Sequence, residues 1–180
     1  MSKSATLIVN LYGGPGSGKS TNAAGAFYAM KSRGINCEYV QEYAKDICWE
    51  GRHYLFSDQL YVFAKQNRRL ERLYDKVDVA ITDCPLLLSY FYGRNPHHLA
   101  LIKEFWEKAP QLHIFLVREK PYSEAGRMQT EEEARAIDVE LRRLMDKIGI
   151  PYWVVFANKE APEAILDIIA MELASPRSNA

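Results

Sequence analysis

The sequence has few cysteines, no excess of either charge and no long hydrophobic run. Its 180 residues include only three cysteines, Cys37, Cys48 and Cys84. An odd number without a CxxC pair favours neither a disulfide framework nor a zinc site. Lys plus Arg and Asp plus Glu both number 23, so the formal net charge of zero provides no strong overall attraction to nucleic acid or anionic lipid. No apolar run approaches the roughly 18 residues of a membrane span, so we expect no membrane association.

The remaining composition is that of an ordinary globular domain. Apolar residues make up 48% and charged residues 26% of a chain whose length suits one domain. Residues 1–5 lead into a short apolar run without a signal-type hydrophobic region. We therefore expect a cytoplasmic, single-domain protein whose last residues, 175–180, form a flexible tail. The sequence contains no heptad run that would indicate an oligomer.

Short β-rich runs alternate with helical patterns along the chain, which is typical of a parallel α/β fold. Strands are predicted at 6–12, 37–42, 77–83, 112–117 and 152–156, and helices at 19–32, 58–75, 96–108, 130–148 and 161–173. The first strand is nearly all apolar, as in a strand buried on both faces, whereas the second is less apolar and is placed nearer an edge. The helix at 58–75 is predicted to bury Leu60, Phe63, Ala64, Leu70 and Leu73.

The segment between the first strand and the first helix fits the pattern GxxxxGK(S/T) at every fixed position. Glycines allow successive backbone N–H groups to point inward around phosphates, and the helix N-terminus adds a partial positive charge. The lysine of the pattern is expected to reach the β- and γ-phosphates, and the hydroxyl after it to ligate Mg²⁺. The pattern predicts a nucleotide-binding site formed by Gly13, Gly14, Pro15, Gly16, Ser17, Gly18, Lys19, Ser20 and Thr21.

Two further short segments, 41–43 (QEY) and 81–83 (ITD), end the second and third strands. Together with the phosphate loop they resemble the small P-loop kinases. Among these, the chain is most similar to the nicotinamide-riboside-kinase domain of the NadR type and to related phage-encoded AAA-type ATPase kinases, over about residues 5–170. The resemblance implies an α/β, single-domain P-loop NTPase fold over residues 1–174, with a five-stranded parallel sheet in the order 2-3-1-4-5, helices on both faces and a short lid. For a phage-encoded protein the compartment would be the host cytoplasm.

Glu42 and Asp83 are the candidate carboxylates of the acceptor side. Ligands of open α/β sheets lie outside the carboxyl ends of the strands, so both residues are expected in one crevice. A kinase needs one carboxylate to orient the acceptor hydroxyl and accept its proton, and an acidic group in the Mg²⁺ shell. The two residues can divide these tasks, with Asp83 also a candidate metal ligand beside Ser20, and the assignment stays open. Alternatively, Asp83 caps a helix beginning near Pro85, and Glu42 is a solvated strand end.

The segment 118–130 follows the fourth strand and corresponds to the mobile lid of P-loop kinases. Arg127 resembles the lid arginine, which would stabilise charge on the transferred phosphate. Arg118 is a second candidate. Either arginine can instead be a surface ion-pair residue beside the glutamates at 131–133, and for Arg118 we favour that interpretation.

Residues 44–57 mix aromatic and polar side chains and are expected to cover the acceptor crevice. Tyr43, Trp49 and Tyr54 are candidates for stacking on a base, although aromatic core packing explains them equally well. The basic side chains of the helix at 58–75 form either a solvated face or a polynucleotide contact; they are Lys65, Arg68, Arg69 and Arg72.

The first hypothesis is an ATP- and Mg²⁺-dependent kinase acting on a nucleoside- or nucleotide-like acceptor. A variant takes its acceptor from DNA, as a modified base or hydroxyl. The alternative is a regulatory P-loop ATPase without a small-molecule acceptor. Such ATPases usually place a water-positioning residue next to the acid that ends the strand, whereas Asp83 is followed by Cys84 and Pro85. This difference favours the kinase.

Overall fold

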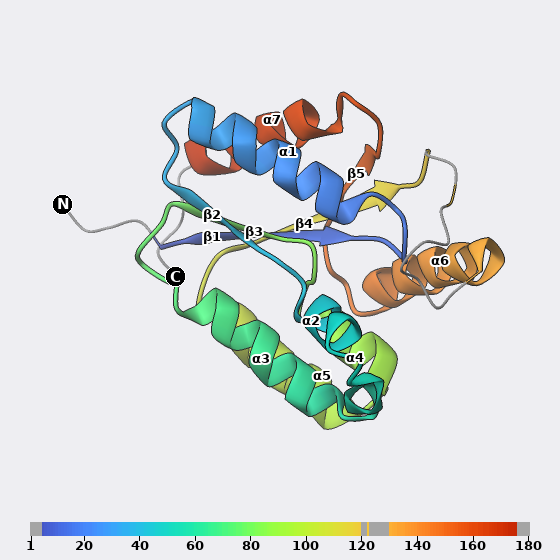
Figure 1. Cartoon of the computed structure of the whole chain (residues 1–180). Helices are drawn as coiled ribbons and strands as arrows, with labels where there is room; N and C mark the ends of the chain where they lie inside the picture. Colours follow the sequence, from blue (N-terminus) through green and yellow to red (C-terminus); the bar gives the residue numbers. More distant parts are fainter. Residues whose placement is uncertain (1–4, 120–121, 123–129, 176–180) are drawn as a thin grey trace.

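The centre of the molecule is a parallel sheet, seen edge-on in Figure 1. The computed structural model describes residues 5–119, 122 and 130–175. In these residues five strands pair in the order β2-β3-β1-β4-β5, which confirms the predicted topology and the edge position of the second strand. The strands are β1 (Leu7–Tyr12), β2 (Cys37–Val40), β3 (Val79–Thr82), β4 (Gln111–Val117) and β5 (Trp153–Phe156).

Helices cover both faces of the sheet (Figure 1). On one face lie α1 (Lys19–Ser32) and α7 (Ala161–Ala174); on the other lie α3 (Gln59–Glu71), α4 (Leu87–Gly93), α5 (Pro96–Trp106) and α6 (Glu131–Lys147). The segment predicted only as a cover contains the short helix α2 (Tyr43–Trp49) and the 3-10 helix η1 (His53–Ser57). None of the helices in the described residues combines the length and apolarity needed to cross a membrane.

Because β1 is buried on both faces, its register in the sheet is fixed, and this register aligns the carboxyl ends of the neighbouring strands. All six of its residues are buried; Leu7 and Val9 pack with α1 and α7, whereas Ile8 packs with α3 and α5. Because a slip of one residue would exchange these faces, the register is strongly specified. In this register Thr82 of β3 lies between Asn10 of β1 and Val40 of β2, so the carboxyl ends of three strands meet at one edge.

The buried face of α3 differs from the prediction. Phe63 and Leu70 are buried as expected, but Leu60 is 52% exposed, and Ala64 is exposed as well. Val62, Gln66 and Asn67 lie on the inner face instead. The apolar pattern could not signal this arrangement because Gln66 turns inward to form hydrogen bonds at the ends of β2 and β3.

The N-terminus of α6 is a capping box. Thr130 Oγ1 accepts a hydrogen bond from Glu133 N, and the Glu133 carboxylate accepts one of 2.7 Å from Thr130 N. This reciprocal pair fixes the start of α6 locally. Most of the predicted lid before it (120–121 and 123–129) lies outside the described residues, as do residues 176–180 of the predicted tail.

Candidate functional site

The phosphate loop connects β1 to α1 through residues 13–18. Gly13, Gly16 and Gly18 have positive φ angles of 142°, 73° and 93°, which L side chains rarely adopt. Gly14 is required for a different reason: a Cβ there would lie 2.7 Å from the carbonyl oxygen of Ala134. The loop conformation therefore depends on glycine at these four positions.

Lys19 is the first residue of α1, and its side chain folds back over this loop. Its Nζ donates hydrogen bonds to the carbonyl oxygens of Gly13 (2.6 Å) and Gly14 (3.0 Å). Burial lowers the pKa of Lys19, while Glu42 and Asp83 oppose this shift. The structure thus brings together the predicted phosphate-loop lysine and the two predicted carboxylates.

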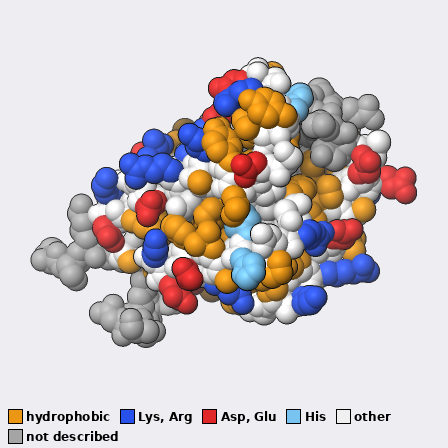
Figure 2. All heavy atoms as spheres, turned by 90° about the horizontal axis from the view of Figure 1, so that it is seen from below, with side chains coloured by type: hydrophobic (Ala, Val, Ile, Leu, Met, Phe, Trp, Pro, Cys, Tyr) orange, Lys and Arg blue, Asp and Glu red, His pale blue; other side chains and the backbone are white. Residues whose placement is uncertain are grey.

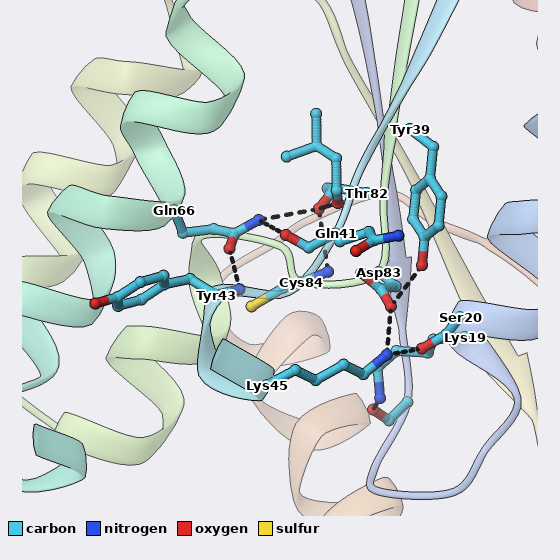
Figure 3. Close-up of polar contacts among 12 residues, drawn as sticks. Lys19, Ser20, Tyr39, Gln41, Tyr43, Lys45, Gln66, Thr82, Asp83 and Cys84 are labelled. Carbon is cyan, nitrogen blue, oxygen red and sulfur yellow. Dashed lines mark hydrogen bonds and ion pairs between the residues drawn. The ribbon is translucent and has the colours of Figure 1, made fainter. Parts of the chain in front are cut away.

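Asp83 lies fully buried at the end of β3 (Figure 3). Its Oδ2 accepts a hydrogen bond of 2.8 Å from the Tyr39 hydroxyl and pairs with Lys45 Nζ at 3.3 Å. Its Oδ1 is buried and has no hydrogen-bond partner among the described residues. The alternative role as a helix cap is wrong, because the N-cap residue of α4 is Leu86.

Ser20 and Asp83 fit a divalent cation bound together with a nucleotide. Lys45 Nζ donates to Ser20 Oγ at 2.5 Å while it pairs with Asp83 (Figure 3), so the two oxygens already share one cationic group. Mg²⁺ in such sites is held by one or two protein oxygens, substrate phosphates and water. Within the part of the chain that the structure describes, no group of three or more His, Cys, Asp and Glu side chains could hold a metal ion. The phosphates would therefore have to supply the other ligands.

Glu42 follows β2 and occupies the N-cap position of α2. Its carboxylate does not cap that helix, and it is half-buried rather than a solvated strand end. Burial raises the pKa of Glu42 and Asp83 adds to this effect, whereas Lys19 and Lys45 oppose it. The result is a carboxylate beside the phosphate loop that holds its proton more readily than an exposed glutamate.

A polar clamp made of Gln66 and Thr82 fixes the ends of β2 and β3. Gln66 Oε1 accepts a hydrogen bond from Tyr43 N (2.8 Å), and its Nε2 donates to Thr82 Oγ1 (3.3 Å). Thr82 Oγ1 in turn donates to the carbonyl oxygen of Val40 (2.9 Å). The clamp holds the residues next to Glu42 and Asp83 in place (Figure 3). Gln66 was not predicted, because no motif in the sequence marks a single inward-facing glutamine.

A family model described as an AAA domain matches residues 8–161. The chain belongs to this AAA-domain family. Comparison with curated proteins gives no match.

The AAA domain is also similar to solved structures of APS kinase CysC from Mycobacterium tuberculosis. A cysteine-to-alanine mutant is 14% identical with a TM-score of 0.53, and the complex with AMPPNP and APS is 13% identical with a TM-score of 0.54. Each match covers 94% of this chain and 98% of the other. At this identity the likeness shows the fold, a single-domain α/β P-loop fold.

Arg118 of the AAA domain is not the surface ion-pair residue that the sequence favoured. Its side chain is 3% exposed and pairs with Asp138 of α6 at 3.0 Å, not with the glutamates at 131–133. It also donates to the carbonyl oxygen of Pro15 (2.9 Å), so it contacts the phosphate loop. Asp138 carried no signal in the sequence. Arg127, the predicted lid arginine, lies outside the described residues.

The aromatic candidates separate into one packed residue and two exposed ones. Tyr43 is buried, and its hydroxyl forms a hydrogen bond with that of Tyr61 (3.0 Å), which is core packing. Trp49 and Tyr54 are 85% and 72% exposed. They remain available for contact with an acceptor. Thr21, the last residue of the predicted loop, is exposed on α1.

The basic side chains of α3 do not form a uniform patch. Arg69 turns inward, where it pairs with Asp46 and donates to the carbonyl oxygen of Gln41 (3.1 Å). On the face seen from below, Lys and Arg side chains lie among acidic and hydrophobic ones (Figure 2). This mixture gives no continuous positive track for a polynucleotide backbone.

Proposed function

We propose that the chain is an ATP- and Mg²⁺-dependent phosphotransferase that moves the γ-phosphate to a nucleoside- or nucleotide-like acceptor. The observation that carries this proposal is the meeting of Lys19 and Ser20 with Glu42 and Asp83 at one edge of the sheet. A phosphate-binding loop alone would suit any P-loop protein. A second carboxylate beside it, not needed to hold the metal, supports an acceptor site. The APS kinase bound to AMPPNP and APS has the same fold and carries both a nucleotide and a second ligand.

Lys19 and the loop bind the donor. The bonds of Lys19 to the carbonyl oxygens of Gly13 and Gly14 hold its ammonium over the loop before nucleotide arrives. Phosphate oxygens then replace these carbonyls as partners of the ammonium, and the backbone N–H groups at the start of α1 face the same charge. Ser20 and Asp83 would hold Mg²⁺, which when bound neutralises charge on the β- and γ-phosphates.

The two carboxylates would take different roles, one as metal ligand and one as general base, an assignment that the sequence left open. Asp83 is assigned to the metal. Its Oδ2 accepts a hydrogen bond from the Tyr39 hydroxyl, and Lys45 links the same oxygen to Ser20, the other candidate ligand. Glu42 is free for the acceptor. Its raised pKa makes it a stronger proton acceptor than an exposed glutamate, which suits a general base that orients an acceptor hydroxyl. Arg127 would approach the transferred phosphate from the lid segment.

Product formation tests the proposal directly. The purified chain is incubated with ATP and Mg²⁺, alone and with pooled nucleosides, nucleotides or DNA, and ADP release is measured with phosphorylated product identified by mass spectrometry. We expect ADP release that depends on a nucleoside or nucleotide. Equal release without acceptor indicates a regulatory ATPase, and release only with DNA identifies a polynucleotide acceptor. Either result, or no turnover, overturns the proposal.

A further inference from the structure

Lys45 is the cation at this site that no motif of the sequence indicated. It lies on α2, one turn after Glu42, and its side chain crosses from the acceptor side to α1 (Figure 3). Its Nζ contacts Ser20 Oγ at 2.5 Å and Asp83 Oδ2 at 3.3 Å. These are the two protein oxygens that the proposed function assigns to the metal. The ammonium therefore lies where a divalent cation bound by both oxygens would lie.

We propose that Lys45 is an exchangeable counter-ion of the metal position: it holds Ser20 and Asp83 in the nucleotide-free chain and yields both oxygens to Mg²⁺ when the metal enters with the nucleotide. The inference rests on the proposed function only in assigning the metal to Ser20 and Asp83. It adds a positioning residue to the site and predicts that the metal binds together with the nucleotide rather than before it.

The burial of Asp83 explains why such a counter-ion is needed. A fully buried carboxylate without a partner is strongly unfavourable, and the hydroxyl of Tyr39 supplies only a neutral hydrogen bond. Lys45 provides the missing charge. Its side chain is 44% exposed, so the ammonium reaches the site from the solvent side and can leave without repacking the core.

The same distances imply that Lys45 and a metal ion compete for one position. An ammonium group and a divalent cation cannot both lie in contact with Ser20 Oγ and Asp83 Oδ2, and their like charges repel. Metal alone must therefore displace Lys45. A metal–nucleotide complex brings phosphate oxygens as additional ligands, and its lower net positive charge repels the ammonium less than a bare metal ion does. Lys45 thereby favours metal entry together with the nucleotide.

The first experiment measures metal binding without nucleotide or turnover. Mn²⁺ is the probe, because free Mn²⁺ is counted directly by electron paramagnetic resonance and it prefers oxygen ligands as Mg²⁺ does. The nucleotide-free chain is compared with Lys45→Met and with Lys147→Met, an exposed lysine at the end of α6. We expect Lys45→Met to bind Mn²⁺ at least about tenfold more tightly than the unaltered chain, because a competing charge is removed. Lys147→Met should bind as the unaltered chain does; equal affinity of all three overturns the proposal.

A second experiment needs no variant, in case Lys45→Met does not fold. Lysines of the unaltered chain are labelled briefly with acetic anhydride and quantified by mass spectrometry, with AMPPNP plus EDTA or AMPPNP plus Mg²⁺. A lysine that leaves the buried carboxylate of Asp83 moves toward solvent and becomes more accessible to the reagent, so we expect labelling of Lys45 to rise at least about twofold with Mg²⁺. Lys19 should be protected in both conditions, which shows that nucleotide is bound. Protection of Lys19 with unchanged labelling of Lys45 overturns the proposal.

The two proposals fail separately. A chain that binds Mn²⁺ more tightly after Lys45→Met, yet shows no acceptor-dependent ADP release, retains the counter-ion and loses the kinase function. A chain with acceptor-dependent ADP release and unchanged Mn²⁺ affinity in Lys45→Met is a kinase in which Lys45 does not compete with the metal.

Discussion

Asp138 on α6 accepts a hydrogen bond of 2.5 Å from the backbone N–H of Gly14 in the phosphate loop. Its other carboxylate oxygen pairs with Arg118, which also donates to the carbonyl oxygen of Pro15. One carboxylate therefore anchors the helix that follows the lid segment to the loop that would hold the nucleotide. This contact joins residues 124 positions apart in the chain.

The anchor can be tested by its contribution to stability. Asp138→Ala leaves the guanidinium of Arg118 buried without its counter-ion, so we expect the free energy of unfolding to fall by roughly 3 kcal/mol. Glu140, on the same helix as Asp138, forms an exposed ion pair with Arg94 at the end of α4, and Glu140→Ala should cost less than about 1 kcal/mol. Urea denaturation measures both. Equal losses would mean that Asp138 acts as an ordinary surface residue.

Lys19 and Asp83 are expected to affect different steps. Lys19→Ala removes the ammonium that faces the transferred phosphate, so turnover should fall at least about a hundredfold. Asp83→Asn should reduce phosphoryl transfer by a similar factor while ATP affinity, measured by isothermal titration calorimetry, stays mostly intact. An Asp83→Asn chain with the original rate would contradict the role of Asp83 at the metal.

Glu42 should determine the acid side of the pH–rate profile. Burial raises its pKa, so as the pH falls toward that value the carboxylate becomes protonated and can no longer accept the acceptor's proton. We expect Glu42→Gln to lower kcat roughly 10²- to 10⁴-fold and to remove this acid limb. Steady-state kinetics across pH, with Glu38→Gln at the exposed face of β2 as the control, measures both effects. A persistent acid limb in Glu42→Gln would assign the base elsewhere.

Gln66 should matter for stability and for acceptor binding together. Gln66→Leu keeps the side-chain size but leaves the Tyr43 N–H without its acceptor and removes one of the hydrogen bonds of Thr82 Oγ1, which should cost about 1–3 kcal/mol. The ends of β2 and β3 loosen, so KM for the acceptor should rise. Arg68→Leu, at an exposed position of the same helix, serves as the control. A Gln66→Leu chain with unchanged unfolding free energy would show that the clamp is dispensable.

His113 predicts a pH dependence of folding that is unrelated to catalysis. It is buried beside Tyr12, whose hydroxyl lies 3.0 Å from His113 Nδ1, and burial lowers its pKa from the ordinary 6.5 to about 4. Between pH 6.5 and about 4, His113 is protonated in the unfolded chain but neutral in the folded chain. The contribution, roughly 3 kcal/mol, is therefore complete above pH 6.5 and is lost progressively as the pH falls from 6.5 to about 4.

Urea denaturation at several pH values measures this dependence. We expect His113→Gln to flatten the decline of unfolding free energy between pH 6.5 and 4, and the exposed His97→Gln to leave it unchanged. The same slope in His113→Gln and the unaltered chain would show that His113 titrates normally in the folded state.

Much of the scaffold could be predicted because its signals are local. The alternation of apolar runs and helical patterns indicated a parallel sheet, and the resemblance to P-loop kinases supplied the strand order that the structure confirms. The prediction was weakest where short polar helices interrupt the pattern. The cover segment became α2 and η1, and α3 buried Gln66 and Asn67 instead of Leu60 and Ala64.

The carboxylates were predictable because each lies within two residues of the end of a strand, and parallel strands end at the same edge. The partners of the site were not. Arg118 was placed at the surface, because nothing near it in sequence reveals that Asp138 covers it.

By itself, the sequence determined the phosphate loop, because glycines with positive φ and a lysine at the start of a helix are constraints that act within eight neighbouring residues. It also determined that Glu42 and Asp83 lie at strand ends. Only the tertiary structure decided which cation pairs with Asp83 and what holds the loop. Lys45 lies 25 positions from Ser20 and 38 from Asp83, and such contacts arise from packing of the sheet and helices rather than from any local pattern.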